Sequence, residues 1–322
     1  MKLGLNEIKA ITFGSLEITE SEGWFCFERM SDEQKSVYDK GHENLRKRCE
    51  CSASIMLDII TDSKKLAFNY RMEHFAASEL DYGYFDVWEN EVMIAHIGEC
   101  SLDNIAGRAE LTLAAGSSRV QIYFPNMFKM KVSDVELDDG ASLSAPKKTD
   151  ALILGDSITQ GFSAVFPSLT YANIIIRELE LNGVNQGIGG EIFRPEILGT
   201  VPLMYPKIIT VALGINEWVG DVISLDNTRA YFEKLRRLYP DAKIFYISPI
   251  WCVDKAKHEN NIPFDKMTSE FEAVAEELGA IAIRGTALMH RVKEFYSDGT
   301  HPNDQGFCQY GNALSIKLKE YI

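Results

Sequence analysis

Residues 150–159 read DALILGDSIT, and this stretch decides the fold of the second half of the chain. Its four apolar residues, 151–154, predict a short buried strand. A Gly-Asp-Ser-Ile-Thr turn follows at once, so Ser157 comes directly after the end of the strand. Taken alone, such a serine is as compatible with a helix N-cap as with a nucleophile. The neighbouring sequence decides between these two interpretations.

Strands and helices alternate downstream of this stretch, with connections long enough for crossovers. Predicted strands lie at 184–185, 207–213, 243–248 and 280–283, and predicted helices at 168–181, 228–238, 264–278 and 304–322. Such alternation predicts a parallel sheet with helices on both faces, in a doubly wound α/β domain.

Upstream, the chain is rich in short strands with frequent aromatic residues and turn formers between them. The predicted strands are 23–27, 55–60, 66–70, 82–88, 92–97, 110–114 and 119–124. This spacing predicts an all-β sandwich or jelly roll. The polar stretch 138–150 contains Gly140 and Pro146 and has no apolar periodicity, so it predicts the junction. We therefore expect a β-sandwich accessory domain at 1–147 and an α/β domain at 148–322.

The composition excludes several function classes. The 322 residues carry 33 Lys+Arg and 47 Asp+Glu, a net charge of −14, with 46% hydrophobic residues. This is a globular mixture, and its acidity disfavours binding to nucleic acid or to anionic membranes. No apolar segment approaches the length of a membrane span, and no secretory signal precedes the first strands, so a cytoplasmic location is expected.

Cysteine usage predicts neither a disulfide scaffold nor a metal site. Six cysteines are too sparse for a disulfide framework in a chain of this length. Cys49 and Cys51 are separated by one residue and have no second pair, which is not the spacing of a zinc site. We expect no metal and no other cofactor. The composition leaves the oligomeric state open.

Four segments that follow predicted strands, or stand near the end of the chain, carry groups suited to acyl transfer. They supply the hydroxyl of Ser157, the glycine-rich run 187–190, the carboxamide of Asn216, and an Asp298/His301 pair separated by Gly299. A histidine can take the proton of a serine, and a carboxylate can hold the useful tautomer of that histidine. Backbone N–H groups of Ser157 and Gly190 and the amide of Asn216 are candidate donors to an oxyanion, with Gly187 and Gly189 as alternatives to Gly190.

At these positions the sequence resembles the SGNH hydrolases, also called GDSL esterases. The GDS block matches at Ser157, the glycine at Gly190, the G-x-N-D block at Asn216, and the D-x-x-H-P block at His301, with Asp298 as third triad member. The resemblance covers about 150–322 and implies the flavodoxin-like SGNH fold with a Ser157–His301–Asp298 triad. One departure is Glu217, where the family usually has Asp; it affects the expected loop geometry more than the chemistry.

The β-rich front half makes the chain similar to two-domain bacterial carbohydrate esterases, which remove acetyl groups from sugars. The GYFDVW stretch at 83–88 and the run 186–191 carry this looser resemblance. It implies a small-molecule ester substrate, such as an acetylated sugar. Candidate pocket residues are Glu191, Phe193, Trp218 and Trp251, and pocket size is expected to depend on the loops 193–205 and 251–263. Packing is the alternative role of the two tryptophans.

The leading hypothesis is a metal-independent serine esterase that hydrolyses small acyl esters, acetyl esters above all, through an acyl-enzyme. An acyltransferase that uses the same triad is the first alternative. The second is a carbohydrate-binding protein whose α/β half is inert, and the complete set of four blocks argues against it.

Overall fold

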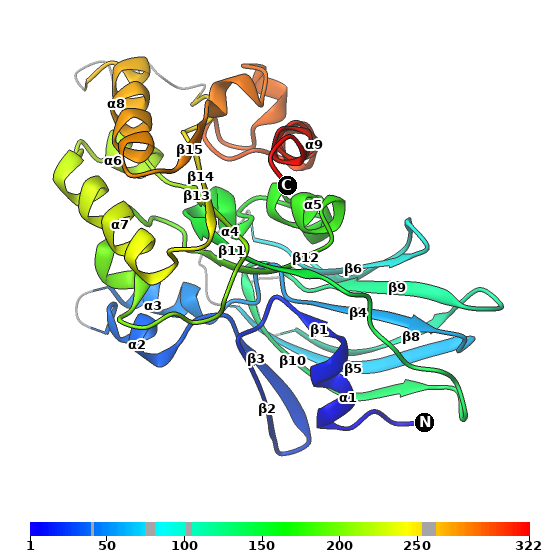
Figure 1. Cartoon of the computed structure of the whole chain (residues 1–322). Coiled ribbons are helices and arrows are strands. Elements are labelled where there is room, and N and C mark those ends of the chain that lie inside the picture. The colour runs from blue at the N-terminus through cyan, green and yellow to red at the C-terminus, as the bar shows by residue number, and fades with distance from the viewer. Residues whose placement is uncertain (40–41, 75–80, 101–104, 253–261) are drawn as a thin grey trace.

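Figure 1 shows the computed structural model of the chain, which describes all residues except 40–41, 75–80, 101–104 and 253–261. Antiparallel sheets occupy the first half, and a parallel sheet covered by helices occupies the second. This confirms the predicted fold class. Most of the predicted pocket loop 251–263 lies outside the described residues.

The front half contains two five-stranded antiparallel sheets. In order, the first consists of β2 (Glu17–Ser21), β3 (Trp24–Glu28), β10 (Phe128–Leu137), β5 (Lys65–His74) and β8 (Ile105–Thr112). The second consists of β1 (Thr12–Phe13), β4 (Met56–Thr61), β9 (Ser118–Tyr123), β6 (Gly83–Glu89) and β7 (Val92–Glu99). From β3 to β10 the chain changes sheet at each connection except the β6–β7 hairpin. This alternation is the arrangement of a jelly roll.

The two antiparallel sheets enclose one apolar core. Phe27 and Val132 of the first sheet and Ile59 and Ile122 of the second belong to the same buried cluster. Along β10, buried and partly exposed residues alternate, as expected where one face of a sheet covers a core. The sandwich is therefore closed by burial of one face from each sheet.

Several elements of the front half were not predicted. They are strand β10, the short strands β1 and β2, and the helices α1 (Leu5–Ile11), α2 (Asp32–Ser36) and α3 (Glu43–Cys49). Helices α2 and α3 lie between β3 and β4 in the chain. They pack away from the sandwich core, because Met30, Tyr38 and Cys49 belong to a cluster of the α/β half.

The parallel sheet of the second half positions the candidate site. Its order is β12 (Leu181–Gly187), β11 (Thr149–Gly155), β13 (Ile208–Ala212), β14 (Lys243–Ile247) and β15 (Ile281–Ile283). In chain order this reads 2-1-3-4-5, the flavodoxin-like arrangement, whose crevice lies at the carboxyl ends of the strands. All five predicted strands are present.

Helices cover both faces of the parallel sheet (Figure 1). Those described are α4 (Ser157–Gln160), α5 (Tyr171–Glu178), α6 (Ile215–Val219), α7 (Leu225–Leu238), α8 (Phe264–Glu277) and α9 (Asp304–Lys319). Single turns of 3-10 helix lie at η1 (Pro167–Leu169), η2 (Pro195–Leu198), η4 (Gly285–Ala287) and η5 (Lys293–Phe295). Helices α5 and α9 pack on one face, and α7 and α8 on the other, each over its own buried apolar cluster.

The two halves share packing across the predicted junction. Met56 and Tyr123 of the sandwich are fully buried in the cluster that α5 and α9 cover. The connection from Leu137 to Thr149 contains one isolated bridge, between Ser144 and Ile60. The domain boundary at 147/148 stays a prediction. Because both halves contribute residues to one buried cluster, the sandwich packs against the α/β half and is not attached by a linker alone.

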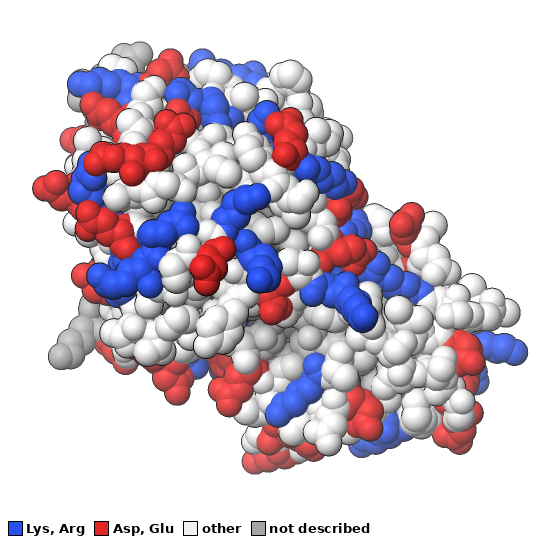
Figure 2. Space-filling model, in the orientation of Figure 1, with Lys and Arg blue, Asp and Glu red and all other residues white. Residues whose placement is uncertain are grey.

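The surface carries charges of both signs. On the face drawn in Figure 2, Lys and Arg side chains are interspersed with Asp and Glu over both halves. On that face, therefore, no continuous basic track is available to a nucleic acid backbone. In the described part of the chain, no helix is long and apolar enough to cross a membrane.

Candidate active site

The candidate nucleophile stands where β11 ends and α4 begins. Asp156 caps α4 by accepting the Ile158 N–H at 2.9 Å, so this carboxylate has the structural role that its position in the turn favours. Gly155 is required before it, because a Cβ there would lie 2.0 Å from Thr159 Oγ1 and 2.8 Å from the Ala212 carbonyl oxygen. The close packing fixes the turn and holds Ser157 at its corner.

The structure brings Ser157, His301 and Asp298 together in one hydrogen-bonded series. Ser157 Oγ lies 2.8 Å from His301 Nε2, and His301 Nδ1 lies 2.7 Å from Asp298 Oδ2. Gly299 has φ +86°, and this left-handed residue lets the chain turn so that the carboxylate meets the ring three residues later. The ring of Phe162 packs beside His301 with centroids 4.5 Å apart.

Asp298 keeps its charge because of the donors around it. Burial by itself would raise the pKa of Asp298, but hydrogen bonds from the His301 ring and backbone and from the Thr300 N–H, together with the charge of His301, lower that pKa to about 2. The carboxylate therefore stays ionised near neutral pH and favours a proton on His301 Nδ1. Nε2 is then free to accept the proton of Ser157.

The glycine-rich run forms a tight turn after β12. The Glu191 N–H donates to the Ile188 carbonyl at 3.0 Å, and Gly190 has φ +87°. The Gly189 N–H donates to Gln160 Oε1 at 2.8 Å, which ties the turn to α4 and so to Ser157. Within the described residues, the backbone N–H groups of Ser157 and Gly190 have no protein acceptor. These two donors are available to a ligand.

Asn216, in α6, holds the far end of this turn. Its Nδ2 donates to the Glu191 carbonyl at 2.8 Å, which leaves the second N–H of the amide for another acceptor. The neighbouring Glu217 accepts the Phe193 N–H at 2.6 Å. The Glu that replaces the usual Asp of the G-x-N-D block therefore ties α6 to the same loop.

Three carboxyl groups are buried behind the site. Burial raises the pKa of Asp156 to about 6 and that of Glu217 to about 7, and it raises the pKa of Glu191 as well. One side-chain oxygen each of Glu191 and Glu217 has no hydrogen-bond partner among the residues that the structure describes. These groups are costly to ionise, which sets them apart from Asp298.

Three of the four predicted pocket residues have buried side chains that pack inside the domain. The side chains of Glu191, Phe193 and Trp218 are 2–3% exposed. Phe193 packs in the core against Tyr231 and Phe271, Trp218 donates its indole N–H to the Ile262 carbonyl, and Glu191 binds Arg194. Aromatic residues after these strands fill the layer under α7 and α8, so they do not face the rim.

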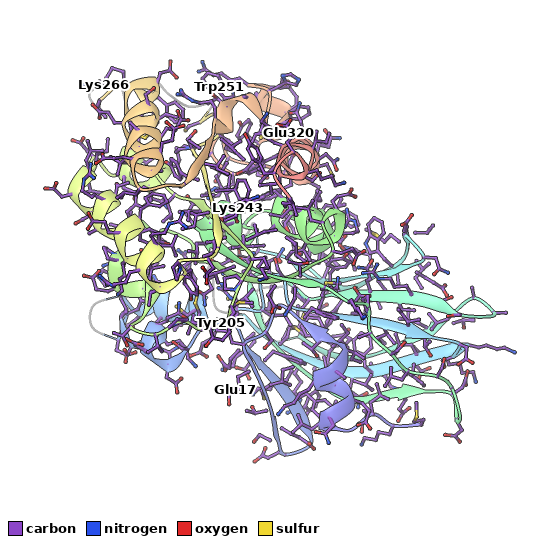
Figure 3. The ribbon with its side chains drawn as sticks, viewed as in Figure 1. Glu17, Tyr205, Lys243, Trp251, Lys266 and Glu320 are labelled. Atoms are coloured by element: carbon purple, nitrogen blue, oxygen red, sulfur yellow. The ribbon has the colours of Figure 1, made fainter. Side chains whose placement is uncertain are left out.

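Trp251 stays a candidate for the pocket. This residue, labelled in Figure 3, is partly exposed. Its indole donates to the Thr286 carbonyl at 3.1 Å, and its ring stacks near Phe264. Cys252, the next residue, lies with its Sγ 3.6 Å from Thr300 Oγ1, beside the Asp298–His301 segment. Trp251 is thus partly exposed and also packs on Phe264. Its two predicted roles, lining the pocket and packing, both stay predictions.

Sequence reasoning missed Gln160 and Phe162. Gln160 lies three residues after Ser157 on the single turn of α4, so the (i, i+3) spacing could have placed it on the same side. Nothing local predicts that Phe162 meets a histidine from the end of the chain. Among the described residues, no group of three or more His, Cys, Asp or Glu side chains could hold a metal ion.

Comparisons with known proteins concern the family of the parallel-sheet half and the fold of the whole chain. Residues 153–307 match the model of the GDSL-like lipase/acylhydrolase family. No curated protein matches the chain in sequence. The salicylyl-acyltransferase of a tetracycline biosynthetic pathway shares 18% identity over 97% of this chain and 95% of its own, with a TM-score of 0.78.

Two further solved structures share the whole fold. A putative GDSL-like lipase from Bacteroides ovatus has 15% identity and a TM-score of 0.74, with coverage of 98% of this chain and 96% of its own. A family two carbohydrate esterase from Cellvibrio japonicus has 14% identity and a TM-score of 0.63, with the same coverage of 98% and 96%. The parallel-sheet half of this chain therefore contains a region, 153–307, that matches the GDSL-like lipase/acylhydrolase family, and the whole chain shares its fold with the carbohydrate esterase.

Proposed function

We propose that the chain is a serine esterase that removes small acyl groups, with acetyl as the first choice, through an acyl-enzyme. The observation that carries this proposal is the series Ser157 Oγ–His301 Nε2–Asp298 Oδ2, with distances of 2.8 and 2.7 Å. An imidazole at this distance can take the hydroxyl proton as the serine attacks an ester. The carboxyl end of the parallel sheet is also where such folds bind ligands.

In the acylation step, Ser157 Oγ forms a bond to the ester carbonyl carbon and its proton passes to His301 Nε2. The carbonyl oxygen becomes an oxyanion, which accepts hydrogen bonds from the Ser157 and Gly190 N–H groups and from the Asn216 amide. Collapse of this intermediate breaks the bond to the alcohol oxygen, which leaves with the proton from His301. Asp298 stabilises the imidazolium throughout.

Deacylation repeats these steps with water. His301 takes a proton from water, the resulting hydroxide attacks the acyl carbon, and Ser157 Oγ leaves with the proton that His301 returns. No redox partner is consumed, and the products are a carboxylic acid and an alcohol. The two half-reactions use the same three donors because both pass through an oxyanion.

A small cavity lies close to the turn that carries Ser157. It is lined by residues that flank Ser157 (Asp156 and Ile158) and by residues of β13, β14 and α9, including Ala212, Ile247 and Tyr310, and its volume is about 20 Å³. That is room for about one water molecule, and neither Ser157 nor His301 lines the cavity, so the cavity does not set the length of the acyl group. We propose an acetylated sugar as the substrate, on the strength of the two-part fold shared with the carbohydrate esterase from Cellvibrio japonicus.

The test compares wild type with Ser157→Ala in the hydrolysis of p-nitrophenyl acetate and of acetylated sugars. We expect the substitution to lower turnover by about 10⁴-fold or more, because the nucleophile is lost while binding remains. Far-ultraviolet circular dichroism and thermal unfolding check that the variant is folded. Turnover by Ser157→Ala at the wild-type rate would overturn the proposal. Equal rates on p-nitrophenyl palmitate would overturn the small-acyl part alone.

The second candidate is transfer of the same acyl group to an alcohol or an amine. It is favoured by the whole-chain fold shared with the salicylyl-acyltransferase. Only the group that meets the acyl-enzyme differs, so the two functions compete at one site. Adding alcohols or amines to the ester assay separates them: acylated product formed faster than free acid would make transfer the main reaction.

A further inference from the structure

The turn that carries Gly190 depends on the orientation of one peptide group. Residues 188–191 close with the Glu191 N–H on the Ile188 carbonyl, and Gly190, in the third position, has φ +87°. Gly189, in the second position, is not in the left-handed region. These are the features of a type II turn, which needs glycine in the third position.

Rotation of the Gly189–Gly190 peptide would remove the Gly190 donor. Type I and type II turns differ by about half a turn of this central peptide. In a trans peptide, the carbonyl of one residue and the N–H of the next point in opposite directions. The type I form would therefore place the Gly189 carbonyl oxygen where the Gly190 N–H now points, and an oxyanion would meet an oxygen in place of a donor.

Arg48, on α3 of the front half, holds the Gly189 carbonyl. Its Nη1 donates to that oxygen at 2.5 Å, while its buried Nε has no acceptor in the described part of the chain. The contact is close, since a Cβ on Gly189 would lie 2.9 Å from Nη1. Helix α3 runs along the turn, and a Cβ on Gly190 would lie 3.5 Å from Leu45 Cδ2.

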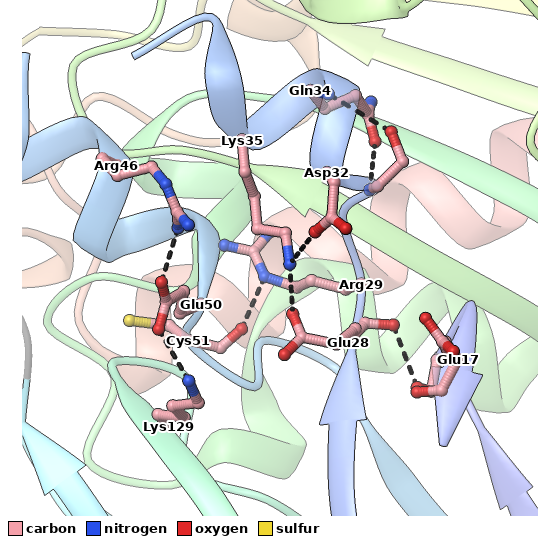
Figure 4. Close-up of polar contacts among 12 residues, drawn as sticks. Glu17, Glu28, Arg29, Asp32, Gln34, Lys35, Arg46, Glu50, Cys51 and Lys129 are labelled. Carbon is pink, nitrogen blue, oxygen red and sulfur yellow. Dashed lines mark hydrogen bonds and ion pairs between the residues drawn. The ribbon is translucent and has the colours of Figure 1, made fainter. Parts of the chain in front are cut away.

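Arg29 binds the C-terminal end of helix α3, the part of the helix that carries Arg48. Arg29 as a whole is 1% exposed. Its guanidinium donates to four carbonyls: Nη2 to Arg48 at 2.6 Å, Nε to Cys51 at 2.6 Å, and Nη1 to Asn185 at 2.7 Å and Gly187 at 2.9 Å (Figure 4 shows the Cys51 contact). One buried side chain thus joins the end of α3 to the end of β12. This contact holds Arg48 in register with the turn.

We propose that Arg48 is a positioning residue for the oxyanion site, and that the front half of the chain thereby takes part in catalysis. The inference rests on the proposed esterase function, in which the Gly190 N–H is an oxyanion donor. Arg48 acts through the Gly189 carbonyl and does not touch the substrate. Its loss lets the 189–190 peptide populate the flipped form, which lowers transition-state stabilisation more than substrate binding.

The test is Arg48→Met in the full chain, with p-nitrophenyl acetate as substrate. We expect kcat to fall by about 10- to 100-fold, less than or equal to the loss of one whole oxyanion donor, with KM changed by less than about threefold. Arg48→Lys keeps one donor and should recover part of kcat. Inhibition by a boronic acid, whose serine adduct carries a negative oxygen, should weaken by the same factor as kcat/KM falls.

Arg46→Met is the matched control. Arg46 lies on the same helix but binds Asp39 and Glu50, away from the turn (Figure 4 shows its contact with Glu50). We expect it to keep kcat within about twofold of wild type. If Arg48→Met does not fold, as judged by thermal unfolding, Arg48→Lys carries the test and must lower kcat without raising KM.

The outcomes separate this inference from the proposed function. If wild type has no esterase activity, or Ser157→Ala retains it, the proposed function fails and takes the inference with it. If activity depends on Ser157 but folded Arg48→Met keeps the wild-type kcat and boronate affinity, only the role of Arg48 is overturned. A rise in KM alone would likewise overturn it, because that pattern indicates lost binding.

Discussion

Asp298 and His301 are held by each other, whereas the turn with Gly190 and the residues just after it are held by side chains from three other segments. On the first side, Asp298 accepts the ring and backbone N–H groups of His301, all within a span of four residues. On the second side, the turn and the residues just after it bind Gln160 from α4, Asn216 and Glu217 from α6, and Arg48 from α3. One side is local in sequence and the other is assembled from the whole chain.

The difference shows that the two sides of the site meet different geometric requirements, a distance on one side and a direction on the other. A histidine and its carboxylate need a fixed distance, which a four-residue loop with one left-handed glycine supplies. An oxyanion donor needs a fixed direction, and a glycine turn is free to rotate its central peptide unless something outside holds it. Mutations on the local side should remove a chemical group, and mutations on the assembled side should alter an orientation.

Asp298→Asn removes the carboxylate on the local side and should have a larger effect than substitutions on the assembled side. The new amide can keep its oxygen toward the backbone N–H groups and turn its Nδ2 toward His301 Nδ1. His301 would then carry its proton on Nε2 and could not accept the proton of Ser157. We expect kcat to fall by about 10³- to 10⁴-fold with little change in KM, measured with p-nitrophenyl acetate.

Two measurements sharpen this result. Thermal unfolding should show a folded variant, because the backbone contacts of residue 298 can persist. Asp298→Ala removes the carboxylate without placing an amide N–H beside His301 Nδ1. It should therefore lose no more activity than Asp298→Asn. A loss below about tenfold in both variants would mean that the local side is not a triad.

Glu217→Gln tests the assembled side. Its expected effect is smaller and appears in the free energy of unfolding. Burial raises the pKa of Glu217 from its ordinary 4.5 to about 7. Between these values the folded chain holds a proton that the unfolded chain has lost, so this group lowers the free energy of unfolding as pH rises. Glutamine does not titrate and can still accept the Phe193 N–H. The variant should gain up to about 3 kcal/mol relative to wild type between about pH 4.5 and 7.

Urea unfolding of both proteins at several pH values between these limits checks this prediction. The free-energy difference between Glu217→Gln and wild type should shift in favour of the variant with rising pH and level off above about pH 7. Below about pH 4.5 the glutamate is protonated in both states, so its titration should contribute nothing. A difference that is independent of pH, or one that shifts toward wild type, would show that Glu217 is ionised in the folded chain at all these values.

Much of the fold was predictable because its signals are local. The five parallel strands are short apolar runs, and Ser157, Asn216 and His301 follow strand ends or stand in a recognisable block. β10 was missed although FKMKVSDVEL alternates apolar and polar residues over most of its length, so its signal was present. The alternation slips at Asp134, where φ is +47° and the register of the ladder shifts.

The pocket and the front helices were not predictable for a physical reason. Phe193 follows a strand end as Ser157 does, but its ring enters the layer between the sheet and α7, and only tertiary packing decides between rim and core. Helix α3 reads ENLRKRC and has no apolar stripe. Its position depends on Arg29, whose four acceptors are backbone carbonyls that no side-chain pattern reveals.

The most direct test of the central claim is to trap the acyl-enzyme. Wild type and Ser157→Ala are mixed with p-nitrophenyl acetate, quenched in acid within the first turnover, digested, and analysed by mass spectrometry. The account predicts an acetyl group on the peptide that contains Ser157 in wild type, at that serine, and none in the variant. Turnover of wild type without any acyl-enzyme, or an acetyl group that accumulates at another residue while Ser157 stays free, would contradict it.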